Sequence, residues 1–157
     1  MAGARTAGQT DFDQAEFGSN YPRITRSPLI VVDASIVVEL IGNGPLVATI
    51  FERLAQSDES FIAPHLLDVE VMSAVRRLSR TGRLDSHRSN EIIQQLLALP
   101  VERYPHLPML DRIWQLRHNF TCYDAAYIAL AEATNSTLYT LDAKLCKGHR
   151  AKVVHFT

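Results

Sequence analysis

The run Leu29-Ile30-Val31-Val32 constrains the fold of this chain more than any other feature of the sequence. The run is short, wholly apolar and rich in β-branched residues, which is typical of a strand buried on both faces of a parallel sheet. Further short strands are indicated at 60–63, 101–104, 138–141 and 153–156, with helical patterns between them. This alternation predicts an α/β fold, in which helices cover both faces of a parallel sheet.

The folded domain is expected to span residues 28–157, and residues 1–27 to form a flexible extension, because they are polar and show no periodicity. The formal net charge of −1 argues against purely electrostatic binding of nucleic acid, but it allows a basic rim around an acidic centre. No signal-like or membrane-spanning apolar segment is evident, and Cys122 and Cys146 lack ligand spacing. We therefore expect a cytoplasmic protein that has no membrane segment, disulfide framework or zinc site.

Four acidic residues occupy unusual positions in this pattern. Asp33 directly follows the first strand, and Asp142 follows the strand at 138–141. Asp124 lies at the start of the most apolar helix, and Glu70 lies at the edge of the buried stripe of the helix at 65–80. Because ligands of such sheets bind at the carboxyl ends of the strands, we expect these four acids to gather at one sheet edge.

Each acid also has a purely structural explanation. The two aspartates that follow strands could cap the helices that begin after them. Thr121 and Asp124 fit a capping box, in which Thr121 is the N-cap residue. Glu70 could pair with Arg76 or Arg77 on its own helix.

The four acids together favour a metal site over these separate explanations. Carboxylates packed side by side repel one another, and at least one is protonated unless a cation offsets the repulsion. Oxygen ligands without a nearby Cys or His pair favour Mg²⁺ or Mn²⁺ over Zn²⁺. A site of this kind activates water and neutralises charge on a phosphoryl group, which indicates hydrolysis of phosphodiester bonds.

Four stretches of the chain resemble the motifs of one known family. They are Val31-Val32-Asp33-Ala34-Ser35 with Glu39 following, Pro64-His65-Leu66-Leu67-Asp68-Val69-Glu70, Thr121-Cys122-Tyr123-Asp124-Ala125-Ala126-Tyr127-Ile128-Ala129-Leu130-Ala131, and Leu138-Tyr139-Thr140-Leu141-Asp142. Their order and spacing resemble those of PIN-domain nucleases, and specifically the VapC-type toxins of bacterial toxin–antitoxin pairs. The resemblance runs through the whole region from about residue 29 to residue 156.

This resemblance implies a fold, a site and an activity. The fold would be a three-layer α/β/α sandwich around a short parallel sheet. The implied site comprises four acids, with Asp33 and Asp124 as metal ligands that Glu70 and Asp142 complete directly or through waters, and the supporting hydroxyls of Ser35 and Thr121. The implied activity is Mg²⁺-dependent endonucleolytic cleavage of RNA by a homodimer that a cognate antitoxin holds inactive.

Other residues are weighed between structural and functional roles. Arg77, on the same side of its helix as Glu70, and Arg117 are candidate RNA contacts, although runs of arginine are usually solvated faces. Trp114 is expected in the core because of its helical spacing. Tyr123 and Tyr127 are expected to pack in the core rather than to stack on bases.

Two further functional classes are open to such a chain. A catalytically silent PIN-like module would keep the acids as helix caps and act only through its protein partner. A receiver-like or phosphatase-like domain usually needs a second acid two residues after the first, or a catalytic lysine after a late strand. Ala34 and Ser35 follow Asp33, so this last class is disfavoured.

Overall fold

The computed structural model describes residues 28–55 and 59–157, so the predicted extension at 1–27 lies outside the described residues. Five strands form one parallel sheet in the order β3-β2-β1-β4-β5. The strands are β1 (Leu29–Val32), β2 (Ser60–Pro64), β3 (Val101–Tyr104), β4 (Thr137–Thr140) and β5 (Lys152–His155). The sheet confirms the α/β class that the alternation predicts.

Strand β1 lies at the centre of the sheet because its side chains are apolar on both faces. Val31 pairs with Ile62 on β2 and with Leu138 on β4, and all three side chains are fully buried. Full burial of Val31 or Ile62 stabilises the fold by about 1.5–3 kcal/mol each. A strand that is buried on both faces places the residue that follows it, Asp33, deep in the molecule.

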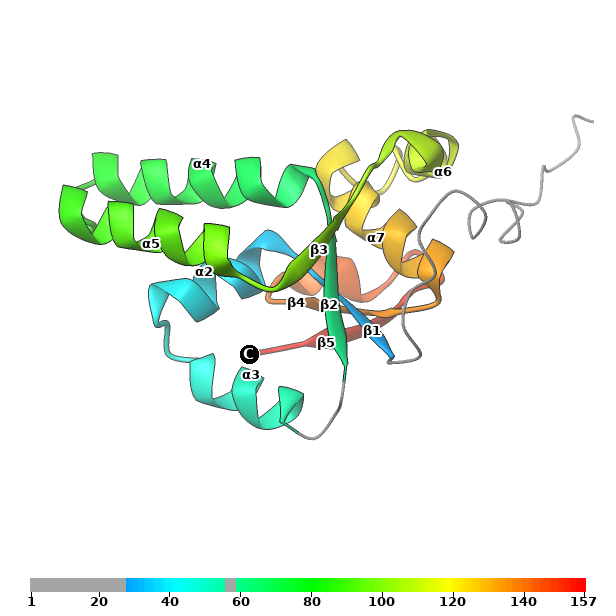
Figure 1. Cartoon of the computed structure of the whole chain (residues 1–157). Coiled ribbons are helices and arrows are strands. Elements are labelled where there is room, and N and C mark those ends of the chain that lie inside the picture. Colours follow the sequence, from blue (N-terminus) through cyan, green and yellow to red (C-terminus); the bar gives the residue numbers. More distant parts are fainter. Residues whose placement is uncertain (1–27, 56–58) are drawn as a thin grey trace, which may run out of the picture.

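The helices form two groups, one on each side of the sheet (Figure 1). The α-helices are α2 (Ala34–Gly42), α3 (Val47–Leu54), α4 (Leu66–Arg80), α5 (Ser86–Ala98), α6 (Leu110–Gln115) and α7 (Cys122–Thr134). Helices α2, α4 and α5 pack against one another, and α6 packs against α7. Right-handed crossovers put the two groups on opposite faces, because the strand order reverses direction after β3. This arrangement confirms the predicted three-layer sandwich.

Helix α7 begins and ends at residues with the expected capping chemistry. The Thr121 side chain accepts a hydrogen bond from the Asp124 amide, and Asn135 ends the helix in the left-handed region at a φ of 50°. Every residue from Ala125 to Ala131 is buried, which confirms the central position that its apolar composition predicts.

The predicted core positions of Trp114 and Tyr123 need correction. The segment at 107–118 is a 3₁₀ turn at Leu107–Met109 followed by the six-residue helix α6, and only one face of that helix packs on α7. Trp114 lies off this face and is 63% exposed, so its predicted place in the core is wrong. Tyr123 is also 63% exposed, because it lies in the first turn of α7, beyond the cover of its neighbours.

Within the described residues, no single helix is long and apolar enough to cross a membrane. Of the helices in the described ranges, one pair, α2 and α3, reaches the necessary length and composition when taken together, and the two helices are bent by 111° at the break between them.

Candidate active site

Asp33 lies at the carboxyl end of β1 and is only 6% exposed. Its Oδ1 accepts hydrogen bonds from the Ser35 hydroxyl at 2.5 Å and from the Ile36 amide at 3.0 Å, so Asp33 is also the N-cap residue of α2. Its Oδ2 accepts a hydrogen bond from the Thr140 hydroxyl at 2.5 Å. Asp33 therefore has the structural role of a cap and a position in a polar cluster at the same time.

Burial raises the pKa of Asp33 above its ordinary value, and the hydrogen bonds from Ser35, Thr140 and the backbone oppose that rise. Thr140 is fully buried at the last position of β4, and the sequence reasoning missed it. The available signal was a hydroxyl at the end of an otherwise apolar strand, two residues before Asp142. Three donors around one carboxylate hold its two oxygens in fixed positions.

Glu70 is half-buried on α4 and accepts a hydrogen bond from the Tyr127 hydroxyl of α7, at 2.6 Å on Oε2. Burial is the largest cause of a raised pKa at Glu70, the Tyr127 hydrogen bond opposes it, and the negative charges of Asp124 and Asp33 raise it further. The ring of Tyr127 is buried as predicted, but its hydroxyl has a polar partner. A pairing of Glu70 with Arg76 or Arg77 is not the contact that this side chain makes.

Asp124 lies in the first turn of α7, the helix that packs against β1. Its Oδ2 accepts a hydrogen bond from the Thr121 hydroxyl at 2.8 Å, and the same hydroxyl oxygen accepts the Asp124 amide at 3.1 Å. Thr121 thus fixes the direction of the Asp124 side chain.

Asp142 joins the group through Thr140. The Asp142 amide donates to Thr140 Oγ1 at 2.9 Å, and the hydroxyl on that oxygen donates to Asp33. The Asp142 carboxylate itself accepts the Lys144 amide at 2.9 Å and caps the 3₁₀ turn at Ala143–Cys146. Ser35 makes a parallel link, since its oxygen accepts the Leu141 amide at 2.9 Å.

The fold therefore brings Glu70 within reach of the charges of Asp33 and Asp124 and ties Asp142 to Asp33 through the Thr140 hydroxyl. In residues 28–55 and 59–157, no three acidic, histidine or cysteine side chains form a ready-made metal cage. Mg²⁺ does not need one, because it keeps several waters and takes one or two protein carboxylates. The set of oxygen donors and the mutual repulsion felt at Glu70 fit a hydrated divalent cation better than a closed structural metal site.

The basic candidates lie outside this cluster. Arg77 is exposed, two helical turns beyond Glu70 on α4, and Arg117 is exposed in the turn after α6. Asp68, which is close to Glu70 in sequence, makes a bidentate ion pair with Arg103 of β3 at 2.9 and 3.4 Å. Asp68 is therefore a structural residue that ties α4 to the sheet.

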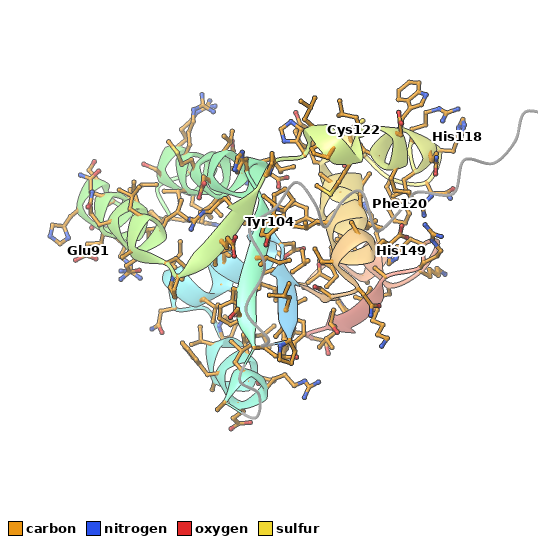
Figure 2. All side chains as sticks on the ribbon, turned by 45° about the vertical axis from the view of Figure 1, so that its right-hand side comes forward. Glu91, Tyr104, His118, Phe120, Cys122 and His149 are labelled. Atoms are coloured by element: carbon orange, nitrogen blue, oxygen red, sulfur yellow. The ribbon has the colours of Figure 1, made fainter. Side chains whose placement is uncertain are left out.

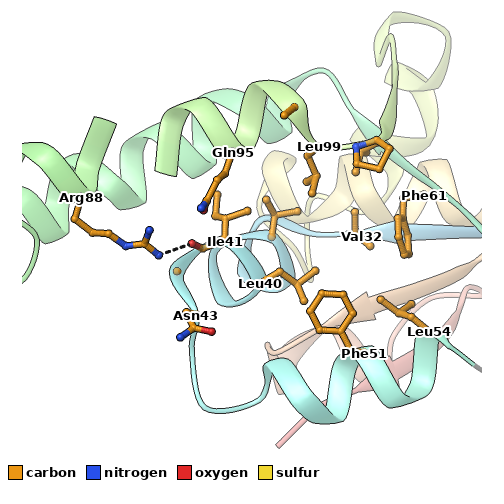
Figure 3. A pocket seen from close by; sticks show the side chains of 15 residues that line it. Val32, Leu40, Ile41, Asn43, Phe51, Leu54, Phe61, Arg88, Gln95 and Leu99 are labelled. Carbon is orange, nitrogen blue, oxygen red and sulfur yellow. Dashed lines mark hydrogen bonds between the residues drawn. The ribbon is translucent and has the colours of Figure 1, made fainter. Parts of the chain in front are cut away.

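A separate apolar groove of about 890 Å³ opens between α2, α3 and α5 (Figure 3). Leu40, Phe51 and Leu99 contribute to its walls, and Phe51 is 57% exposed. The Arg88 guanidinium donates to the carbonyl of Ile41 at 2.9 Å and closes one end. The four acids do not line this groove, so it is a surface of a different kind.

The chain matches one protein family and resembles several known proteins. The PIN domain family matches residues 30–150. The chain is similar to Ribonuclease VapC9 of Mycobacterium tuberculosis, with 39% identity over 118 residues, or 74% of this chain and 88% of the relative. Among solved structures it is similar to PAE2754 from Pyrobaculum aerophilum, with a TM-score of 0.61 and 22% identity over 80% of this chain and 83% of the other. It is also similar to VapBC2 from Rickettsia felis bound to a DNA fragment from their promoter, with a TM-score of 0.58 and 14% identity over 81% of this chain and 98% of the other.

Proposed function

Because the chain belongs to the PIN-domain family and to its VapC branch, we propose that it is the toxin endoribonuclease of a toxin–antitoxin pair. The observation that supports the activity is the acidic cluster at the sheet edge, where the hydroxyls of Ser35 and Thr140 hold the buried Asp33 and the Tyr127 hydroxyl holds Glu70. The proposed reaction is hydrolysis of RNA phosphodiester bonds, with Mg²⁺ or Mn²⁺ as cofactor. Because its proposed substrate is RNA, we propose that the protein acts in the cytoplasm.

The proposed metal-holding residues are Asp33 and Asp124, because hydroxyl and amide donors already fix the Asp33 carboxylate and the Thr121 hydroxyl fixes that of Asp124. Glu70 and Asp142 complete the site directly or through waters. A bound divalent cation supplies charge that lowers the pKa of an attacking water and offsets the charge of the phosphate. The protein groups orient this chemistry: Ser35 and Thr140 keep Asp33 in place, and Thr121 does so for Asp124.

The proposal is tested by two aspartate-to-asparagine changes at helix N-caps. Asp33→Asn removes the charge from the site and keeps an N-cap residue, since asparagine caps helices as well as aspartate does. Asp85→Asn is the matched control, because Asp85 caps α5 through the Arg88 amide and lies on the surface. Purified Asp33→Asn protein should lose at least about 100-fold in cleavage of single-stranded RNA with Mg²⁺, the scale expected when a positioned catalytic group is removed. The Asp85→Asn protein should keep full activity.

The alternative is a catalytically silent module that acts only through its partner, and the same proteins discriminate the two. Mg²⁺ should raise the melting temperature of the wild-type and Asp85→Asn proteins but not of Asp33→Asn, because a ligand that binds only the folded state stabilises it. A shift that is equal in all three proteins, together with cleavage that Asp33→Asn retains, would favour the silent module.

We also propose that the cognate antitoxin inserts an apolar segment into the groove between α2, α3 and α5. The groove is large and apolar, and one structural neighbour is a VapBC assembly, which supports a partner of this kind. Phe51→Glu places a charge in its exposed wall and should prevent copurification with the cognate antitoxin, whereas Phe51→Leu should preserve it. Equal copurification of both variants would place the antitoxin elsewhere.

We propose that the homodimer forms through exposed apolar side chains of the elements that follow β2 and β3, at the carboxyl edge of the sheet. Val69 and Met72 of α4 are 66% and 53% exposed, and Leu107, just after β3, is 70% exposed. Strands β2 and β3 are neighbours, so the elements that follow them leave the sheet side by side. A self-complementary apolar surface suits a two-fold interface. Met72→Asp should shift the solution mass from dimer to monomer in light scattering, and an unchanged mass would contradict the assignment.

A further inference from the structure

Trp114 and Arg117 form a stacked pair on the surface of the molecule. The Arg117 guanidinium carbon lies 4.7 Å from the centre of the indole ring, and Arg117 Nη1 also donates to the Trp114 carbonyl at 2.8 Å. The indole is 63% exposed, so it contributes little to the core. A backbone-anchored guanidinium over an exposed indole is a flat, rigid, cationic surface of the kind that nucleobases stack on.

The chain leads directly from this pair to the acidic cluster. After α6 the amides of Asn119 and Phe120 both donate to the Leu116 carbonyl, which makes a compact turn. The turn ends at Thr121, the residue that orients Asp124. Arg117 is thus four residues from the cap of α7 and belongs to the segment that positions a proposed metal ligand.

A second segment lies against this turn. The ring of Phe120 is 5.6 Å from that of His149, and a side chain at Gly148 would meet the edge of Phe120 at 3.2 Å (Figure 2). Gly148 also adopts a φ of 93°, which favours glycine. The segment after Asp142 therefore packs on the turn after α6, and both border the same site.

Both segments are cationic, whereas the whole chain carries a formal net charge of −1. No acid occurs between Asp111 and Asp124, nor anywhere after Asp142. The charged side chains of these two stretches are Arg112, Arg117, Lys144, Lys147, Arg150 and Lys152. Arg112 and Arg150 pair with Glu132. Arg117 precedes Asp124 in the chain, Lys144 and Lys147 follow Asp142, and Lys152 begins β5 at the opposite edge of the sheet. This charge is complementary to a polyanion rather than to an apolar protein surface.

From this arrangement we propose that Trp114 and Arg117 form a stacking platform for an unpaired base of the RNA substrate. The inference rests on the proposed ribonuclease function and narrows its substrate class. A base that stacks on protein is not paired in a duplex, so the preferred target is a single-stranded segment or loop. The platform binds the base, and the neighbouring cations contact the phosphates on either side.

The sequence provides a direct reporter, because Trp114 is the only tryptophan of the chain. The full-length Asp124→Asn protein, which should bind without cleaving, is titrated with a single-stranded RNA of about ten nucleotides, a length within the range of single-strand binding sites. A second oligomer of equal length has abasic sugars in place of nucleotides. We expect quenching of tryptophan emission by the first oligomer and little change with the second.

Variants separate stacking from charge and from general surface effects. Trp114→Ala should weaken RNA binding about tenfold, the scale of one lost base stack, and Trp114→Phe should recover part of it. Arg117→Lys keeps the charge but lacks the planar group, and should weaken binding less than Trp114→Ala. Leu97→Ala is the matched control, because it truncates an exposed apolar side chain on a different helix, α5. This variant should bind RNA as the parent protein does.

Several outcomes would overturn the platform. One is equal quenching by the two oligomers, and another is unchanged binding in Trp114→Ala protein that melts as the parent does. Emission that changes with protein concentration in the absence of RNA would assign Trp114 to a contact between copies of the chain. Cleavage by Asp33→Asn protein would instead refute the proposed function, whereas an inactive Asp33→Asn beside a fully active Trp114→Ala would refute only the platform.

Discussion

The Thr140 hydroxyl connects two acidic residues of the cluster through its hydrogen bonds. It is fully buried, donates to Asp33 Oδ2 at 2.5 Å and accepts the Asp142 amide at 2.9 Å. Thr140→Val keeps the shape of the side chain and removes both contacts. Water cannot replace the hydroxyl at a site without solvent access, so a buried carboxylate loses a donor and an amide loses its acceptor.

The expected loss of stability follows from these two contacts. A hydrogen bond to a charged group contributes about 1.5–3 kcal/mol, and a neutral one about 0.5–1.5 kcal/mol. The added methyl group offsets part of the sum, so we expect the free energy of unfolding to fall by about 2–3 kcal/mol. With a urea slope of about 1–3 kcal/mol per molar, the unfolding midpoint should move by roughly 1 M or more.

The assay is urea unfolding of the metal-free protein, with Thr137→Val as the matched control. Thr137 begins the same strand and is only partly buried, so its replacement should change the free energy of unfolding by less than about 0.5 kcal/mol. Equal stabilities of the two variants would refute the reasoning, because the Thr140 hydroxyl would then have no net role at Asp33. In cleavage assays Thr140→Val should also lose activity, since Asp33 would be held less firmly.

Two further predictions follow from perturbed carboxylates elsewhere in the molecule. Tyr127→Phe removes the hydrogen bond that opposes the raised pKa of Glu70, so the acidic limb of the cleavage–pH profile should move to higher pH, and an unmoved limb would mean that Glu70 does not titrate in the reaction. Burial by itself raises the pKa of Glu132, but the hydrogen bonds and charges of Arg112 and Arg150 bring it below its ordinary value of 4.5. Because the folded-state pKa is the lower one, this contribution to stability is present above pH 4.5 and is lost as the pH falls through the folded-state value. Glu132→Gln should therefore cost about 1.5–3 kcal/mol in thermal or urea unfolding at pH 7, the scale of a hydrogen bond to a charged group. This difference should shrink towards pH 3, and a difference independent of pH would contradict the ion pair.

Much of the fold is local enough to be predicted from the sequence. The apolar run at 29–32 gives a strand buried on both faces whatever surrounds it, and this places Asp33 at its end. Thr121 and Asp124 lie three residues apart, so a single helical turn is sufficient to join them. The cap chemistry and the strand–helix alternation therefore predicted both positions.

The partners of the acids required the tertiary structure. Thr140 is 107 residues from Asp33, and Tyr127 is 57 residues from Glu70. A pattern of period 2 or 3.6 shows which face of an element is apolar, but not which side chain of another element meets the polar group at its edge. The sequence therefore left open a pairing of Glu70 with an arginine of its own helix, and the structure shows Tyr127 as its partner instead.

The exposure of Trp114 also could not be predicted from its sequence pattern. Its spacing indicates a helix, and α6 is a helix that packs on α7, but the buried side chains in and beside it are Met109, Ile113 and Leu116, and the indole stays exposed. The sequence by itself determined the order of strands and helices and the positions of Asp33 and Asp124, because short-range sterics and hydrogen bonding set them. The tertiary structure decided the contacts of the Thr140 hydroxyl with Asp33 and of the Tyr127 hydroxyl with Glu70, and the exposure of Trp114, because those depend on which surfaces meet.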